Sequence, residues 1–234
     1  MRAVAGRASN VREGSVPFLA LSFSLLTFHF SPAEAQPAPD ARAIVSRAAA
    51  AYRQLTSLEA AFTQRIDDPM VGLLESEGHV WQAGNDRLAM RFSDPAGEAV
   101  VMDGRHLWIY TPSTAPGQVI RLPVPERPTY GFNVLAWILD RPSERYTVKF
   151  LREDHVAGRP VDVVEMIPRE TDMPFTRAVV WLDRGDALPR RLEVREPGGS
   201  LRTIGLTNLK RNAPVGAKTF VFEVPRGVRI IDQS

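Results

Sequence analysis

Two different hydrophobic periods follow one another along the chain. Behind Asp40, apolar residues recur at helical spacing at Ile44, Ala48, Ala51 and Leu55. This spacing predicts one amphipathic helix that begins behind an acidic N-cap. Beyond the helix the period changes to two, and runs rich in Val, Ile, Phe, Trp and Thr are separated by Asp-Gly, Gly-Gly and proline-containing turns, which predicts strands.

About a dozen strands are expected from the alternating runs. Because no helix long enough to serve as a crossover lies between them, they are expected to form an antiparallel meander and not a parallel sheet. The expected strands are 58–67, 73–82, 87–92, 99–102, 106–110, 118–122, 146–153, 160–167, 177–183, 190–195, 201–209 and 220–224. The apolar segment 129–140 interrupts the series after a proline-marked stretch and predicts a short helix in a long loop.

Alternation within the strands separates two faces. Leu88, Met90 and Phe92 project to one side, whereas Arg87 and Arg91 project to the other. We therefore expect one apolar face and one charged, wet face. A many-stranded meander of this kind twists and curls, so it must close on itself, stack, or wrap around an inserted element. The predicted fold is mainly β (α+β), a curved antiparallel sheet covered by the N-terminal helix and the 129–140 segment.

The N-terminal residues have the pattern of a secretory signal peptide. Arg2, Arg7 and Arg12 precede the mostly apolar run 16–30, and small residues flank a candidate cleavage site in 33–35. The run is shorter than the roughly 20 apolar residues that span a bilayer. We expect residues 1–35 to be removed near Ala35, and residues 36–234 to form a single domain outside the cytoplasm.

Composition excludes several classes of function. The chain has 29 Lys and Arg against 27 Asp and Glu, a net charge of +2, so it lacks the dense cationic surface that non-specific nucleic-acid binding requires. It contains no cysteine, which excludes disulfides, thiolate nucleophiles, cysteine-ligated metals and a lipidated N-terminal cysteine.

Catalytic motifs are missing from the sequence. His79, His106 and His155 stand singly, without the spacing of a metal site, and no nucleophile elbow, P-loop or dinucleotide fingerprint occurs. The tripeptide 184–186 spells Arg-Gly-Asp, but between two expected strands it is interpreted as a hairpin turn. We expect a protein that is not an enzyme and that needs no metal or cofactor; an active site would have to be assembled from distant residues.

An ordered set of segments resembles the periplasmic outer-membrane lipoprotein carrier protein family, LolA. The segments are 57–64 (SLEAAFTQ), 77–81 (EGHVW), 91–95 (RFSDP), 101–110 (VMDGRHLWIY) and 220–228 (FVFEVPRGV). The resemblance covers nearly the whole of residues 36–234. It implies an incomplete barrel of about eleven strands, closed by helices that act as a lid over an apolar cavity for the acyl chains of lipoproteins. It also implies a periplasmic monomer that receives its cargo from an inner-membrane ABC transporter and passes it to an outer-membrane receptor, with only transient contacts to these membrane proteins.

In these terms, the candidate residues fall into two groups. The expected walls of the lipid-binding cavity, for which plain core packing is the alternative, are Leu88, Met90, Phe92, Phe62 and Trp108. For Phe62 and Trp108 the structural role is the favoured interpretation. The expected lid residues, for which a fixed plug is the alternative, are Phe132, Val134, Leu135, Trp137 and Ile138.

The sequence departs from the family just after Trp81. Family members commonly carry a basic-Arg-Pro step there, whose arginine is thought to latch the lid, whereas this chain has Gln-Ala-Gly-Asn at 82–85. Three alternatives follow: Arg87 substitutes as the latch, the lid is held differently, or the protein is a paralogue with another cargo. A different class of function is also open, namely a periplasmic lipid- or protein-sensing regulatory domain of the same architecture, similar to an anti-sigma regulator.

Overall fold

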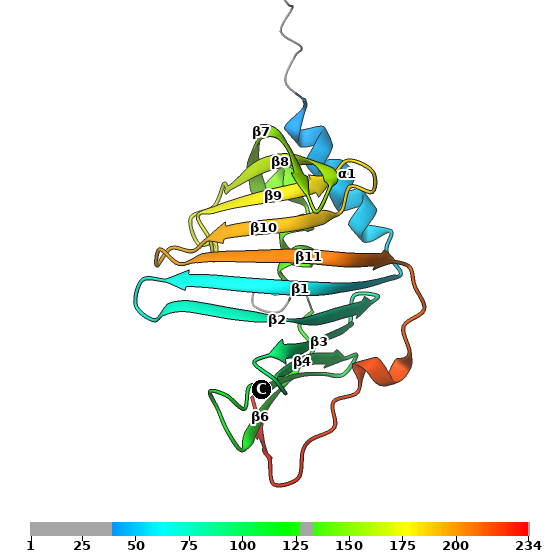
Figure 1. Ribbon diagram of the computed structural model, residues 1–234, viewed down its shortest axis with the longest axis vertical. Coiled ribbons are helices and arrows are strands. Elements are labelled where there is room, and N and C mark those ends of the chain that lie inside the picture. The colour runs from blue at the N-terminus through cyan, green and yellow to red at the C-terminus, as the bar shows by residue number, and fades with distance from the viewer. Residues whose placement is uncertain (1–38, 127–132, 234) are drawn as a thin grey trace, which may run out of the picture. The chain divides into compact units, whose positions relative to one another are not determined.

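The computed structural model describes residues 39–126 and 133–233; the expected signal peptide lies outside these ranges, as does Phe132 (Figure 1). In the described ranges the chain forms a few short helices and a series of strands, in this order: α1 Ala41–Arg53, β1 Ser57–Asp68, β2 Gly72–Ala83, β3 Arg87–Asp94, β4 Ala99–Asp103, β5 His106–Tyr110, β6 Gln118–Pro123, α2 Val134–Leu139, α3 Pro142–Arg145, β7 Tyr146–Val156, β8 Arg159–Pro168, β9 Arg177–Asp183, β10 Pro189–Arg195, β11 Leu201–Arg211, the 3-10 helix η1 Ala217–Phe220, and β12 Arg229–Asp232.

All twelve strands of the described residues belong to one sheet, in the order β12-β6-β5-β4-β3-β2-β1-β11-β10-β9-β8-β7. Its edge strands β12 and β7 do not pair with each other, so the sheet is open (Figure 1). The mainly β, unclosed curved sheet with few helices confirms the predicted fold class. Eleven of the expected strands are present, with ends that coincide or differ by at most three residues.

The C-terminal part of the strand prediction is wrong. Residues 220–224 do not form a strand: the chain makes η1 and then continues without regular structure to β12, which was not predicted. β12 pairs with β6 in parallel, with Ile230 opposite Val119, so the sheet is not wholly antiparallel. The alternation of Phe220, Phe222 and Val224 has another cause, because Phe220 is buried and the other two are partly buried against the sheet. Alternation reports a half-buried extended chain, and such a chain need not pair with a strand.

Helix α1 begins where the sequence predicts. The Asp40 carboxylate accepts a hydrogen bond from the backbone N–H of Arg42 at 2.9 Å, which satisfies one of the free donors of the first turn. Ile44 and Ala48 lie on the buried side of the helix, as expected, together with Val45. The helix packs against β7, β8, α2 and α3.

The sheet has an inner face, which we define as the face covered by α1, α2 and α3. Three apolar clusters lie along it. The first joins α1 and α2 to β7–β10, the second surrounds Phe62 on β1, and the third surrounds Leu88 on β3. Leu135 of α2 belongs to the edge of the first two clusters, and Met90 to the edge of the last two. The inner face is therefore one continuous apolar surface.

The outer face is not uniformly wet, which corrects the expectation for it. On β3–β6, Ala89, Val101, Trp108 and Val119 are all buried in a cluster on this side. Residues 213–228, here called the C-terminal strap, cover them through Phe220 and its neighbours. The strap makes the outer side of these strands a second, smaller core.

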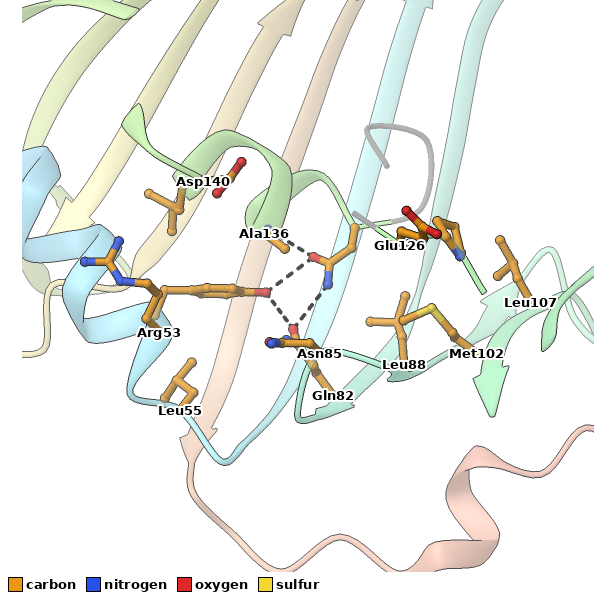
Figure 2. A pocket seen from close by; sticks show the side chains of 14 residues that line it. Arg53, Leu55, Gln82, Asn85, Leu88, Met102, Leu107, Glu126, Ala136 and Asp140 are labelled. Carbon is orange, nitrogen blue, oxygen red and sulfur yellow. Dashed lines mark hydrogen bonds between the residues drawn. The ribbon is translucent and has the colours of Figure 1, made fainter. Parts of the chain in front are cut away.

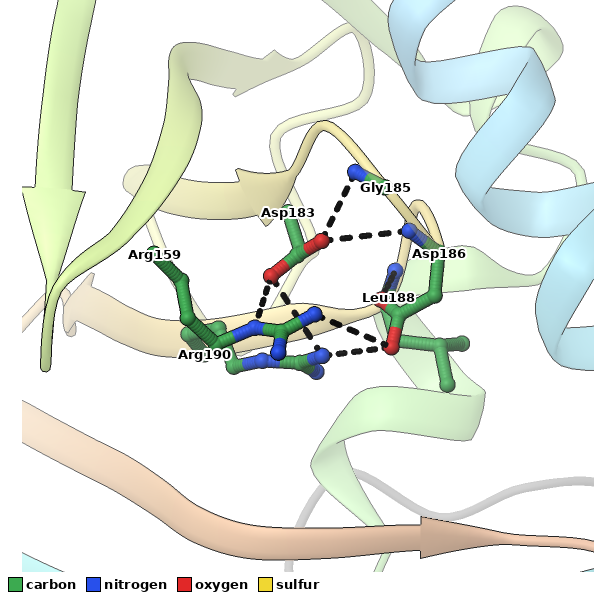
Figure 3. Close-up of polar contacts among 6 residues, drawn as sticks. All are labelled: Arg159, Asp183, Gly185, Asp186, Leu188 and Arg190. Atoms are coloured by element: carbon green, nitrogen blue, oxygen red, sulfur yellow. Dashed lines mark hydrogen bonds and ion pairs between the residues drawn. The ribbon is translucent and has the colours of Figure 1, made fainter.

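The Arg-Gly-Asp tripeptide lies in the turn between β9 and β10, as predicted (Figure 3). Asp183 at the end of β9 is buried, Asp186 in the turn is half-buried, and both form ion pairs with Arg159 and Arg190. Burial alone would raise the pKa of Asp183, but hydrogen bonds from Arg159 and the backbone of Asp186 and Gly185, together with the charge of Arg190, lower that pKa to about 2. The aspartate of the tripeptide is thus part of a structural ion cluster and is not presented to solvent.

Candidate functional site

A cavity of about 290 Å³ opens on the inner face, between the end of α1, helix α2 and one end of β2–β5 (Figure 2). Leucine and methionine side chains form its apolar floor, and amides and charged groups form its rim. It is lined by Tyr52, Arg53, Leu55, Gln82, Asn85, Leu88, Met102, Leu107, Pro125, Glu126, Asn133, Ala136, Leu139 and Asp140.

Strand register assembles the floor. Leu88 lies opposite Met102 in the β3–β4 pair, and Met102 lies opposite Leu107 in the β4–β5 pair. The Asp103 carboxylate accepts hydrogen bonds from the N–H groups of Arg105 and His106 and fixes the turn between β4 and β5. Met102 and Leu107 were not singled out from the sequence, although the Asp-Gly turn between them, combined with alternation, sets them face to face.

The predicted cavity residues are only partly brought together. Leu88 lines the cavity, whereas Phe62, Met90 and Phe92 continue the same inner face beyond it. The rings of Phe62 and Phe92 pack edge to face, with centroids 5.2 Å apart. Leu135 of α2 packs against the same cluster, which is centred on Phe62.

Trp108 lies apart from the cavity. It points to the outer face, where its ring stacks on Phe222 at 5.5 Å and its Nε1 donates to Asp103 at 2.8 Å. Its neighbour Leu107 occupies the inner face instead, because consecutive residues of a strand point to opposite sides. The structure places Trp108 under the C-terminal strap, in keeping with the structural alternative for this residue.

The predicted lid residues lie over the inner face. Ile138 is buried in the first inner cluster, and Val134, Leu135 and Trp137 pack against it and are partly buried. Leu135 also packs against the cluster around Phe62. Helix α2 therefore fills the space over the sheet with its own apolar side chains.

Three polar side chains join this helix to its surroundings, and we call them the lid clasp: Tyr52 of α1, Gln82 of β2 and Asn133, the N-cap of α2. The Tyr52 hydroxyl donates to Oε1 of Gln82 at 2.6 Å and lies 3.3 Å from Oδ1 of Asn133, while Nδ2 of Asn133 donates to Oε1 of Gln82 at 3.4 Å (Figure 2). Oδ1 of Asn133 also caps the helix at the N–H of Ala136. Burial raises the pKa of Tyr52 to about 12, against the lowering effect of its bonds to Asn133 and Gln82, so this hydroxyl keeps its proton near neutral pH.

The other end of α2 is held by Arg145. Its Nη1 donates to the carbonyl oxygen of Trp137 at 2.7 Å, and its guanidinium lies 4.0 Å from the centre of the Trp137 ring. This contact combines a charge-assisted bond to the end of a helix with a cation–π interaction. Helix α2 is thus fastened at both ends by side chains from neighbouring elements.

Arg87, the candidate latch, is exposed at the start of β3, and its side chain makes no hydrogen bond or ion pair with the described part of the chain. Gln82, directly after Trp81, holds the lid through the clasp instead. In the described residues, Asn133 at the start of α2 bonds to Tyr52 and Gln82 and not to Arg87.

In residues 39–126 and 133–233, no three His, Asp or Glu side chains are grouped as they would be to hold a metal ion. No helix in those residues is both long and apolar enough to cross a bilayer.

Comparison with known proteins agrees with this architecture. The model of the family "Outer membrane lipoprotein carrier protein LolA" matches residues 53–223. An outer-membrane lipoprotein carrier protein of Alkalilimnicola ehrlichii is 26% identical over 183 residues, which cover 77% of this chain and 80% of the relative. A structure of an uncharacterized conserved protein from Thermus thermophilus has a TM-score of 0.54 at 12% identity, covering 83% of this chain and all of that one. The Pseudomonas aeruginosa MucA/MucB complex gives a TM-score of 0.50 at 19% identity, covering 82% of this chain and 64% of that one. The chain belongs to the outer membrane lipoprotein carrier protein family, LolA.

Proposed function

We propose that this protein is a periplasmic carrier that shelters the acyl chains of lipoproteins against its inner face. In this proposal it receives them from an ABC transporter of the inner membrane and passes them to a receptor of the outer membrane. The observation that carries the proposal is a continuous apolar inner face, roofed by a short helix whose apolar side chains pack on it. The proposed role of the protein consists of binding and releasing lipoproteins, and it includes no catalytic step.

The energetics of acyl chains explain why such a carrier is needed. Each methylene left in water costs about 0.8 kcal/mol, so a sixteen-carbon chain represents on the order of 12 kcal/mol. A lipoprotein with several such chains does not cross water unaided. A cavity fully complementary to several acyl chains would not release them either. Its binding free energy would approach the practical ceiling of non-covalent complexes, near 20 kcal/mol.

The lid supplies the weakening that release requires. The cavity of about 290 Å³ is slightly smaller than the roughly 300–1,000 Å³ of typical ligand pockets, and in this proposal it is what remains open while helix α2 covers the inner face. Leu135 and Ile138 occupy the space over the inner face that an acyl chain would take. Cargo must displace them, and the closed form therefore competes with binding.

Mass spectrometry tests the proposal directly. The full chain is isolated gently from its own cell envelope and examined for acylated proteins that travel with it. We expect diacylated or triacylated lipoproteins in amounts comparable with the carrier, and their loss from a Leu88→Asp, Met90→Asp variant that charges the inner face. An Ile167→Asp variant, changed at an exposed apolar site on β8, serves as the matched control. Recovery of the carrier without acylated protein, in both the native and the control form, would contradict the proposal.

The fold shared with MucB supports a second candidate, a regulatory domain that senses a lipid or a protein partner. One solved structure shows MucB in complex with MucA, and this chain covers 64% of that chain. The same isolation separates the two functions: a sensor would be recovered with one stable protein partner that carries no acyl group, and a carrier with many acylated ones.

A further inference from the structure

The hairpin between β1 and β2 ends in an exposed apolar tip, which we define as Met70, Val71, Leu73 and Leu74. Their side chains are 95%, 70%, 48% and 48% exposed. These four residues are more than half of the seven large hydrophobic residues that are exposed in the described ranges, and the other three are scattered. Single exposed apolar side chains are ordinary, but a cluster of them marks a surface that another molecule covers.

The apolar tip is held rigidly in its exposed position. Oδ1 of Asp68 accepts hydrogen bonds from the N–H groups of Met70 and Val71 at 2.9 and 3.0 Å, which fixes the turn. Its Oδ2 accepts a bond from the Ser200 hydroxyl at 2.6 Å and so ties the hairpin to the turn between β10 and β11. The bond from Ser200, with those from Met70 and Val71, lowers the pKa of Asp68, so these contacts hold at neutral pH. A preorganised tip loses little conformational entropy when it binds.

The apolar tip lies at the opposite end of the strands from the cavity (Figure 1). The cavity touches Gln82 at one end of β2, and the apolar tip begins beyond Gly72 at the other. Ten residues of extended chain separate these ends by roughly 33 Å. A molecule bound at the apolar tip would leave the cavity free.

The charges around the apolar tip indicate the kind of partner. Residues 65–77 carry Asp67, Asp68, Glu75 and Glu77 against the single cation Arg65, which already pairs with Glu75 at 3.0 Å. A surface of anionic lipid headgroups would repel this excess of carboxylates, whereas a protein surface with lysine or arginine would attract it. We propose that the apolar tip docks into an apolar groove of a partner protein, and that basic side chains border that groove.

This inference does not depend on the identity of the cargo. The tip would hold the carrier on its partner while the lid and cavity at the far end remain able to exchange a ligand. Docking and ligand binding are therefore expected to respond to different substitutions.

Photocrosslinking in intact cells of the source organism tests the docking. A benzoylphenylalanine at position 70 of the full chain is compared with one at Ile167, a 43% exposed apolar residue of β8. We expect a protein adduct from position 70 that is missing from position 167. Position 70 adducts that contain only lipid, only a second copy of this chain, or no other molecule would each overturn the proposal.

Reconstitution with the crosslinked protein then tests the chemistry of the groove. We expect Met70→Ser and Val71→Ser each to weaken binding about tenfold, and Ile167→Ser to leave it unchanged. Binding should weaken as salt is raised, and less steeply in the Asp67→Asn, Glu77→Gln variant. Equal affinities for the tip variants and the native chain would contradict the proposal that the tip binds in an apolar groove. A salt-independent affinity would contradict the proposal that basic side chains border that groove. Affinity for a fluorescent fatty acid, measured in the same variants, should not change, so a failure here is distinct from a failure of the carrier proposal.

Discussion

At the scale of single residues, Gln82 is where the three parts of the site meet. Its side-chain oxygen accepts from Tyr52 of α1 and from Asn133 at the start of the lid helix, although Gln82 itself belongs to a strand of the sheet. Hydrogen bonds of this kind contribute little each, about 0.5–1.5 kcal/mol net. A lid fastened in this way is held in place and can still be opened by a ligand.

Replacing this amide should loosen the lid. Gln82→Leu removes the acceptor of both bonds while keeping the approximate size of the side chain, and it should cost about 1–3 kcal/mol of stability because partly buried donors lose their partner. The uptake rate of a fluorescent fatty acid should rise, since the closed form is less favoured. Stopped-flow fluorescence measures that rate and urea unfolding measures the stability.

Gln64→Leu is the matched control, because Gln64 also hydrogen-bonds on the inner face, to Ser76 and Arg202, but far from the lid helix. It should lower stability without changing the uptake rate. An unchanged uptake rate in Gln82→Leu would mean that the clasp does not hold the lid helix closed.

The buried carboxylate of Asp183 predicts a dependence of stability on pH. Its pKa is about 2 in the folded protein against an ordinary 3.8, so the folded form binds its proton more weakly than the unfolded chain. The resulting stabilisation, roughly 2 kcal/mol, is present above pH 4 and is lost as the pH falls toward 2. Urea unfolding at a series of pH values should show this loss. Asp183→Asn should be less stable at pH 7 and should show a shallower slope between pH 4 and 2, while Asp172→Asn, at an exposed site, should follow the native curve.

At the scale of elements, the C-terminal strap determines how much of the outer face is dry. Phe220 is 3% exposed and packs with Trp108 and Val119, although its own segment forms no strand. The guanidinium of Arg91 donates to the carbonyl oxygen of Val221 at 2.9 Å, so a residue expected to be solvated on the outer face anchors the strap. The strap then leads into β12, which adds a parallel strand at the edge of the sheet.

Truncating Phe220 should therefore destabilise the whole sheet. We expect Phe220→Ala to lower the free energy of unfolding by about 3–5 kcal/mol, since it removes a large buried side chain and leaves a cavity. Its neighbour Val221 is 49% exposed, and Val221→Ala should change the value by less than about 0.5 kcal/mol. Both values come from urea unfolding. Similar values for the two variants would mean that the strap contributes little to the fold.

The same segment shows what could and could not be predicted from the sequence. Alternation located eleven strands, most of which bury one face more than the other, and the Asp40 cap located α1. It could not distinguish the strap from a strand, since both present every second side chain to a core. The expectation that Trp108 lines the cavity failed for a related reason. A strand between two cores has apolar residues on both sides, so the pattern does not tell which side faces the cavity.

The clasp was beyond prediction for a different reason. Tyr52, Gln82 and Asn133 are far apart in the sequence, and polar residues without a recognisable spacing carry no signal until the fold brings them together. Gln82 does lie within the segment 82–85 where the sequence departs from the family.

At the scale of the whole molecule, binding has two opposing parts that can be measured separately. Each methylene of a ligand that is buried on the inner face should add about 0.8 kcal/mol, or roughly a fourfold gain in affinity. Displacing Leu135 and its neighbours should cost a fixed amount that does not depend on chain length. A plot of binding free energy against the number of carbons therefore has a slope set by the sheet and an offset set by the lid.

A charge at position 135 should change only the offset of this plot and leave its slope unchanged. Leu135 packs against two inner clusters in the closed form, so Leu135→Asp should keep the lid helix away from the inner face. For a series of fluorescent fatty acids, we expect the native chain and Leu135→Asp to share one slope, with uniformly tighter binding in the variant because the lid no longer competes. Leu73→Asp, an exposed control on the hairpin, should match the native chain in slope and offset. A native affinity that does not change with chain length would mean that hydrocarbon is not buried on the inner face, and the carrier function would then fail with it.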